Sequence, residues 1–132
     1  MTRYAIDATT AIRIVRDGID VPAHHQLVAP KMLHSEALYQ LYTAVRRGEI
    51  TEKDAHAVLL GITTMKIRLL GDRVSRANAW KVATQLDWPD TARAEYVAVA
   101  LLQADAFVTV DDDLARELDG VVELAPFESL TD

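Results

Sequence analysis

The sequence predicts an α/β fold, arranged as a three-layer α/β/α sandwich around a central, mostly parallel sheet. Short runs of apolar and β-branched residues alternate with longer segments whose apolar residues recur at helical spacing. Strands separated by helices pair in parallel through right-handed crossovers, which places helices on both faces of the sheet. The chain has 132 residues, 50% of them hydrophobic and 26% charged, which suits a single globular domain over residues 1–132.

Two strand–helix units are predicted at the start of the chain. A strand over residues 3–6 ends at Asp7, which directly precedes a helix over residues 8–15. A second strand over residues 26–29 is closed by a proline. The helix that follows, residues 32–47, carries apolar side chains at four-residue spacing and ends at a glycine.

The middle of the chain is predicted to form two helices with a strand between them. Acidic residues in the first turn of residues 51–60 complement the helix dipole, and Gly61 is expected to end this helix. The β-branched and apolar residues 64–70 then indicate a strand, with a helical continuation as the alternative. A further helix is predicted over residues 72–86.

The last part of the chain repeats this alternation. A proline-containing break at residues 87–90 starts a helix that runs to about Gln103, and its second half is apolar nearly all round and so should be buried. A strand at residues 106–110 follows, then a helix at 114–118 and a last strand at 121–124. The final few residues are expected to fray.

Composition narrows the function classes. The chain has no cysteine, which excludes disulfides and thiolate chemistry and fits a reducing cytoplasm. Neither a signal peptide nor a run of roughly 18 apolar residues is present, so no membrane association is expected. The net charge of -6 is the wrong sign for a broad basic surface that holds nucleic acid. Either the partner is not nucleic acid, or the excess acid is concentrated in a site for divalent cations, which we favour.

Carboxylates from distant parts of the chain are predicted to form such a site. Asp7 and Asp111 each follow a predicted strand, and parallel strands present their carboxyl ends at one edge of a sheet. Glu36 lies beside the apolar stripe of its helix, although from spacing alone it could equally point to solvent. Clustered carboxylates repel one another, and hard oxygen ligands suit Mg²⁺ or Mn²⁺.

The order of these elements resembles the PIN-domain nucleases over almost the whole chain. The first acid is followed by Thr9, a later Pro-x-x-Leu-x-x-Glu stretch spans residues 30–36, and a Val-Thr-Val-Asp run ends at Asp111. The likeness looks strongest to the VapC toxins of bacterial toxin–antitoxin pairs. Those toxins match the length of the chain, its Arg-Arg-Gly-Glu-Ile run at 46–50 and its Ala-Glu-Tyr-Val-Ala-Val-Ala run at 94–100.

The resemblance implies a metal-dependent endoribonuclease that cleaves RNA phosphodiester bonds by attack of water. It also implies a homodimer that is inhibited by a VapB-like antitoxin, which inserts a basic side chain into the acidic pocket. Thr9 and Thr109 match the hydroxyl residues that support the acids. Asp113 is a candidate further ligand. The alternative is that Asp112, Asp113 or both cap the following helix, and we favour this capping role for Asp112. The implied metal ligands are Asp7, Glu36, Asp111 and Asp113.

One acid of the family pattern is missing, because Arg93 stands where an aspartate is usual. Asp90, one helical turn earlier on roughly the same face, is the better substitute, and Glu95 is the alternative. A role for Asp90 in capping its helix or complementing the helix dipole is as well supported as a role in the acidic site. Arg13 and Arg16, and Lys31 or Arg93, are candidates for binding the RNA backbone, with surface charge of no specific role as the alternative. The rival hypothesis is a PIN-like RNA- or protein-binding module with impaired catalysis, in which Arg93 replaces the metal as a built-in cation.

Overall fold

The computed structural model describes residues 1–132 and contains one four-stranded sheet in the order β3-β2-β1-β4. Every pair of neighbouring strands in this sheet is parallel. The prediction of a parallel α/β sheet is therefore confirmed. The strands are β1 (Thr2–Ile6), β2 (His25–Pro30), β3 (Ile67–Leu70) and β4 (Ala106–Val108).

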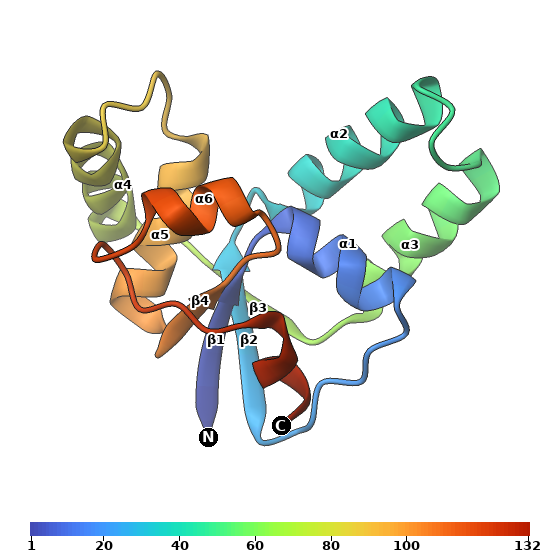
Figure 1. The fold of residues 1–132 in the computed structure, drawn as a ribbon, viewed down its shortest axis with the longest axis horizontal. Helices are drawn as coiled ribbons and strands as arrows, with labels where there is room; N and C mark the ends of the chain where they lie inside the picture. Colours follow the sequence, from blue (N-terminus) through green and yellow to red (C-terminus); the bar gives the residue numbers. More distant parts are fainter.

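Helices cover both faces of the sheet and complete the three-layer sandwich. In Figure 1, α1, α2 and α3 lie on one side of the strands, and α4 and α5 lie on the other. A short helix, α6, follows β4, and a 3-10 turn, η1, ends the chain beside the amino ends of the strands. Their bounds are α1 (Ala8–Arg16), α2 (Leu33–Arg46), α3 (Glu52–Thr64), α4 (Arg73–Gln85), α5 (Ala92–Gln103), α6 (Asp112–Glu117) and η1 (Phe127–Thr131). None of these helices has the length and hydrophobicity needed to cross a bilayer.

The core is formed where α1 and α5 pack against the strands. Ile6, Val28 and Phe107, from three different strands, are fully buried together with Val97 from α5. The prediction that the second half of α5 is buried holds only up to Ala100. Leu101 and Leu102 follow it and are 45% and 39% exposed.

Gly61 does not end α3, which runs to Thr64, so the predicted boundary is wrong. A Cβ atom at this position would lie 2.5 Å from Cγ1 of Val15 on α1. The glycine is needed because the two helices approach closely here, and a glycine inside a helix costs only about 1 kcal/mol relative to alanine. As a consequence β3 begins at Ile67, later than the predicted start at residue 64.

The predicted strand over residues 121–124 is also wrong, since only one bridge forms, between Phe107 and Leu124. The amides of Val121 and Val122 both donate to the carbonyl of Leu118 in the turn after α6, so they are not available for pairing. The residues that follow do not fray, because Leu130 in η1 is fully buried.

Candidate functional site

Asp7 is the most buried carboxylate of the predicted site, at 7% exposure. It follows β1 and caps α1, with its Oδ1 accepting the Thr10 N–H at 2.9 Å. Its Oδ2 accepts the hydroxyl of Thr109 at 2.6 Å. Burial raises the pKa of Asp7, the hydrogen bonds from Thr10 and Thr109 lower it, and the nearby charge of Asp111 raises it further.

Glu36 lies in the first turn of α2, half-buried and turned toward α5. Its Oε2 accepts the hydroxyl of Tyr96 at 3.2 Å, so the solvent-facing alternative does not apply. Burial is the main cause that raises the pKa of Glu36, and the charges of Asp7 and Glu95 raise it as well. Burial and the adjacent Glu36 charge raise the pKa of the Tyr96 hydroxyl far above its ordinary value. Tyr96 therefore stays protonated and acts as a donor to Glu36.

Thr9 does not support Asp7 as the resemblance implied. Its hydroxyl donates to Oε1 of Gln40 on α2 at 3.1 Å, and the amide of Gln40 lies 3.5 Å from Oε1 of Glu36. These contacts link α1 to α2 and orient Glu36 rather than Asp7. A helix cap bonds to the third residue after it, which is why Thr10 and not Thr9 meets the carboxylate.

Thr10 is a fully buried residue of the site that the sequence reasoning missed. Its hydroxyl accepts the Val110 N–H at 3.2 Å and donates to the Val108 carbonyl at 3.4 Å. These bonds join α1 to the end of β4 and hold Thr109 against Asp7. A buried threonine three residues after a capping aspartate was the available signal.

Asp111 lies close to Asp7 but also caps α6. Its Oδ1 accepts two N–H groups of the first turn of α6, at 3.0 and 3.1 Å, whereas its Oδ2 has no hydrogen-bond partner. The Thr109 hydroxyl that donates to Asp7 also accepts the Asp111 N–H at 3.1 Å. One threonine thus connects the two strand-end carboxylates. The capping role that we considered for Asp112 belongs to Asp111.

The remaining predicted acids make local contacts. Oδ1 of Asp90 accepts the Ala92 N–H at 3.0 Å in the turn before α5, whose N-cap is Thr91, so Asp90 makes a local contact without being the helix cap. Asp113 forms an ion pair with Arg116 on its own helix. Neither acid is among the charges that act on Asp7 or Glu36, whereas Glu95 acts on Glu36 and Tyr96.

Arg13 and Arg93, two of the predicted RNA-binding residues, do not face the acids. Nη1 of Arg93 lies 3.0 Å from Oε2 of Glu117, and its guanidinium stacks on Trp88 with 4.5 Å to the ring centroid. Arg93 is therefore not a built-in cation of the acidic site, which removes the observation that the rival binding-module hypothesis required. Arg13 pairs with Asp17 at 3.2 Å and lies 4.6 Å from the ring centroid of Phe127, near the amino ends of the strands.

The acidic residues fit a divalent cation by their chemistry but do not form a closed cage. No group of three or more histidine, aspartate or glutamate side chains converges in a way that could hold an ion. Asp7, Glu36 and Asp111 nevertheless form no ion pair with any basic residue. Each carboxylate has about four lone-pair sites, so hydrogen-bonded oxygens can still coordinate. Uncompensated hard oxygen donors at one sheet edge are what Mg²⁺ or Mn²⁺ would require.

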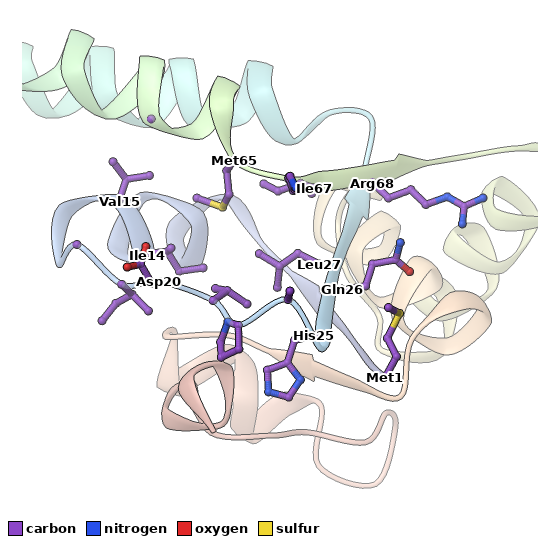
Figure 2. A pocket seen from close by; sticks show the side chains of 17 residues that line it. Met1, Ile14, Val15, Asp20, His25, Gln26, Leu27, Met65, Ile67 and Arg68 are labelled. Carbon is purple, nitrogen blue, oxygen red and sulfur yellow. The ribbon is translucent and has the colours of Figure 1, made fainter.

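A large cavity lies at the other end of the sheet. Figure 2 shows this hollow of about 830 Å³, lined by apolar side chains of α1, α3 and the amino ends of β2 and β3, such as Ile14, Leu27, Met65 and Ile67. None of the predicted acids lines it. The acidic edge and this apolar cavity are therefore separate features of the molecule.

Comparisons with known proteins show the fold. The crystal structure of PAE2754 from Pyrobaculum aerophilum superposes with a TM-score of 0.76 at 21% identity, over 98% of this chain and 92% of that chain. A structure of VapBC-1 from nontypeable Haemophilus influenzae superposes with a TM-score of 0.61 at 14% identity, over 96% and 98% of the two chains. No protein-family model and no curated protein matches the sequence. At these identities the superpositions define the class of fold, a PIN-like α/β/α sandwich.

Proposed function

We propose that the protein is a metal-dependent endoribonuclease of the VapC type, the toxin of a toxin–antitoxin pair. One observation carries the proposal: near the carboxyl edge of a parallel sheet, the charge of Asp7 interacts with those of Asp111 and Glu36, and none of these three carboxylates has a basic partner. Ligands of open α/β sheets bind at this edge. The PIN-like fold and its likeness to VapBC-1 support the same assignment.

Asp7, Glu36 and Asp111 are the proposed ligands of Mg²⁺ or Mn²⁺. Glu95 is the fourth acid that the structure favours, because its charge acts on Glu36, while Asp90 and Asp113 are engaged locally. When bound, the ion would lower the pKa of a coordinated water and offset negative charge on the phosphate.

The side chains of the protein supply orientation and proton transfer. Thr10 and Thr109 fix both oxygens of Asp7, and Tyr96 fixes one oxygen of Glu36, so these carboxylates are pre-oriented. A carboxylate of the site that does not coordinate the ion can accept the proton of the attacking water. Water attacks the phosphorus in line, one P–O bond of the backbone breaks, and the leaving oxygen takes up a proton.

We further propose that the acidic edge receives a basic side chain of a VapB-like antitoxin, and that the protein acts in the cytoplasm as a homodimer. The negative charge of the site, which Arg93 does not neutralise, is what such a side chain would complement.

Replacing Asp7 with asparagine tests the proposal. Asp7→Asn keeps the size of the side chain and the acceptor for Thr10, and removes the charge. We expect RNA cleavage with Mn²⁺ to fall by more than about 100-fold, beyond what loss of a merely supporting group produces. Asp17→Asn, on the same helix but paired with Arg13, is the matched control and should cleave at the wild-type rate. Cleavage by Asp7→Asn at the wild-type rate, or wild-type cleavage that EDTA leaves unchanged, would contradict the proposal.

A further inference from the structure

We propose that a hollow beside the acidic edge binds a backbone phosphate of RNA that flanks the cleaved one. This inference rests on the proposed function, since it assigns a substrate-binding site to the same reaction. The hollow has a volume of about 140 Å³, several times the roughly 30 Å³ that a water molecule occupies in the liquid. Its lining residues are Pro30, Lys31, Leu70, Gly71, Ser75, Arg76, Glu95 and Val99.

The position of the hollow relative to Asp7 follows from the sheet. Its floor is made by the carboxyl ends of β2 and β3, at Lys31 and Gly71, and β2 is the direct neighbour of β1, which ends before Asp7. Neighbouring strands lie about 4.8 Å apart, so the hollow begins one strand spacing from Asp7 and reaches a second. A phosphate there would lie next to one held at the acids.

Two cations face this hollow from opposite sides. Lys31 follows β2, and Arg76 lies in the first turn of α4. Neither forms an ion pair within 4.0 Å, although the charge of Arg76 acts on the nearby Asp72. The aliphatic stem of Lys31 lies over Gly71, since a Cβ there would be 3.9 to 4.0 Å from its Cγ, Cδ and Cε. The absence of a side chain at Gly71 therefore keeps the hollow open beneath the lysine.

Glu95 lies between the hollow and the acidic site. Its carboxylate lines the hollow and its charge also acts on Glu36. Among the residues that line the hollow, Lys31 and Arg76 face this one carboxylate, and Asp72, on which Arg76 also acts, lines the adjoining hollow. A divalent ion held by the acids would engage Glu95 and strengthen the positive field toward a phosphate.

A second hollow of about 470 Å³ continues from the first, and Lys31, Gly71 and Ser75 line both. It runs between β3, α4 and α5 as far as Gln103. Asp72 lines this part, but its carboxylate accepts the Ser75 N–H at 2.9 Å as the cap of α4. The continuity gives an RNA strand a path from the acids over Lys31 and Arg76.

Binding of a fluorescein-labelled, single-stranded RNA 12-mer, followed by anisotropy in EDTA at several salt concentrations, tests the inference without cleavage. We expect Lys31→Ala/Arg76→Ala to weaken binding by about tenfold at low salt. The slope of log K against log salt should become shallower by about 0.7, the value for one phosphate contact on a single strand. The matched control is Lys66→Ala/Arg68→Ala, which removes one lysine and one arginine at the amino end of β3 and should bind like the wild type.

Two variants of Gly71 leave the charge of the hollow unchanged and test whether its open volume is needed for RNA binding. Gly71→Ala places a Cβ at ordinary contact distance from Lys31 and should bind RNA normally. Gly71→Leu fills the hollow and should weaken binding about as much as loss of the two cations. Circular dichroism of both variants checks that the domain is folded.

The outcomes for this inference and for the proposed function are distinguishable. RNA binding in EDTA that depends on Lys31 and Arg76, together with no cleavage of RNA by the wild type when Mn²⁺ is added, supports the phosphate site and overturns the nuclease. The phosphate site is overturned if the Lys31→Ala/Arg76→Ala variant binds as tightly, and with the same salt slope, as the Lys66→Ala/Arg68→Ala control. It is equally overturned if the wild type does not bind the RNA.

Discussion

The surroundings of Asp7 disfavour its charged form, so its pKa is raised. Burial removes water from the carboxylate, and the neighbouring Asp111 adds like charge, so the hydrogen bonds from Thr10 and Thr109 offset only part of the effect. The folded protein therefore binds the Asp7 proton more tightly than the unfolded chain does. Protein groups placed in this way are typical of functional sites, where stability is given up for chemistry.

The sign of this pKa shift predicts how stability depends on pH. The contribution of Asp7 to stability is fully present below the pKa of the unfolded chain and is lost as pH rises through the higher pKa of the folded protein. Asp7→Asn should therefore stabilise the metal-free protein at pH 7, by about 1 kcal/mol or roughly 4 °C in Tm. The gain should shrink toward pH 4. Thermal denaturation at both pH values measures it, and a variant that is less stable than the wild type at pH 7 would show that the charged carboxylate is stabilising.

Glu95 and Asp90 can be compared directly as the fourth acid. Because the Glu95 charge acts on Glu36 and Asp90 only accepts the Ala92 N–H, we expect Glu95→Gln to weaken Mn²⁺ binding by about tenfold. Asp90→Asn should leave Mn²⁺ affinity unchanged, since asparagine can also accept the Ala92 N–H. Calorimetric titration of the two variants with Mn²⁺ measures the difference. If Asp90→Asn weakened Mn²⁺ binding and Glu95→Gln did not, Asp90 would be the substitute for the missing aspartate, as its position on the helix face alone suggests.

At the residue scale the sequence predicted which acids lie at the edge of the sheet but not how they are held. Strand ends locate Asp7 and Asp111 because parallel strands share a carboxyl edge. Tyr96 and Glu95 approach Glu36 across sixty residues of sequence, through the packing of α5 near α2. The spacing of apolar residues within one helix does not reveal which residues of another helix it will contact.

The approach of α1 to α3 depends on the absence of a side chain at Gly61. A Cβ atom would lie 2.5 and 3.2 Å from the two terminal carbons of Val15. Gly61→Ala should gain helix propensity but force the helices apart, with a net loss of about 1–3 kcal/mol in the free energy of unfolding. Urea denaturation measures this loss.

The double variant Gly61→Ala/Val15→Ala provides the control for this steric reason. Shortening Val15 removes the clashing carbons, so the second substitution should recover much of the stability lost by the first. Additive losses in the two single variants would show that the packing of α1 on α3 does not depend on this contact.

At the element scale, all the main helices and four of the five predicted strands form. The errors fall where tertiary contacts decide the backbone. Residue 61 resembles a helix end, but its glycine serves a close helix contact. Residues 121–124 have strand composition, but the turn after α6 uses the first two of their amides. Local propensity is overridden at residue 61 by a close contact with α1, and at residues 121 and 122 by hydrogen bonds to Leu118 in the preceding turn.

At the scale of the whole molecule, the two ends of the sheet have different chemistry. The carboxyl edge gathers Asp7, Glu36 and Asp111, and the amino end holds the apolar cavity of Figure 2. Topology produces this separation, because every strand runs in the same direction. The net charge of -6 thus includes acids that the fold places near one edge of the sheet, as expected if part of the excess acid serves to bind a cation.

The acidic edge connects the strand ends with α1, α2 and α5. A cation bound there would therefore contact elements from across the fold, and we predict that it stabilises the whole domain. A ligand that binds only the folded state adds about 2.7 kcal/mol when present at 100 times its Kd. We therefore expect Mn²⁺ at that level to raise the Tm of the wild type by on the order of 10 °C. Asp7→Asn should start from a higher Tm without the ion and respond little to it. Thermal denaturation with and without Mn²⁺, at ionic strength matched with NaCl, makes the comparison. An equal rise in both proteins would place the ion elsewhere on the surface.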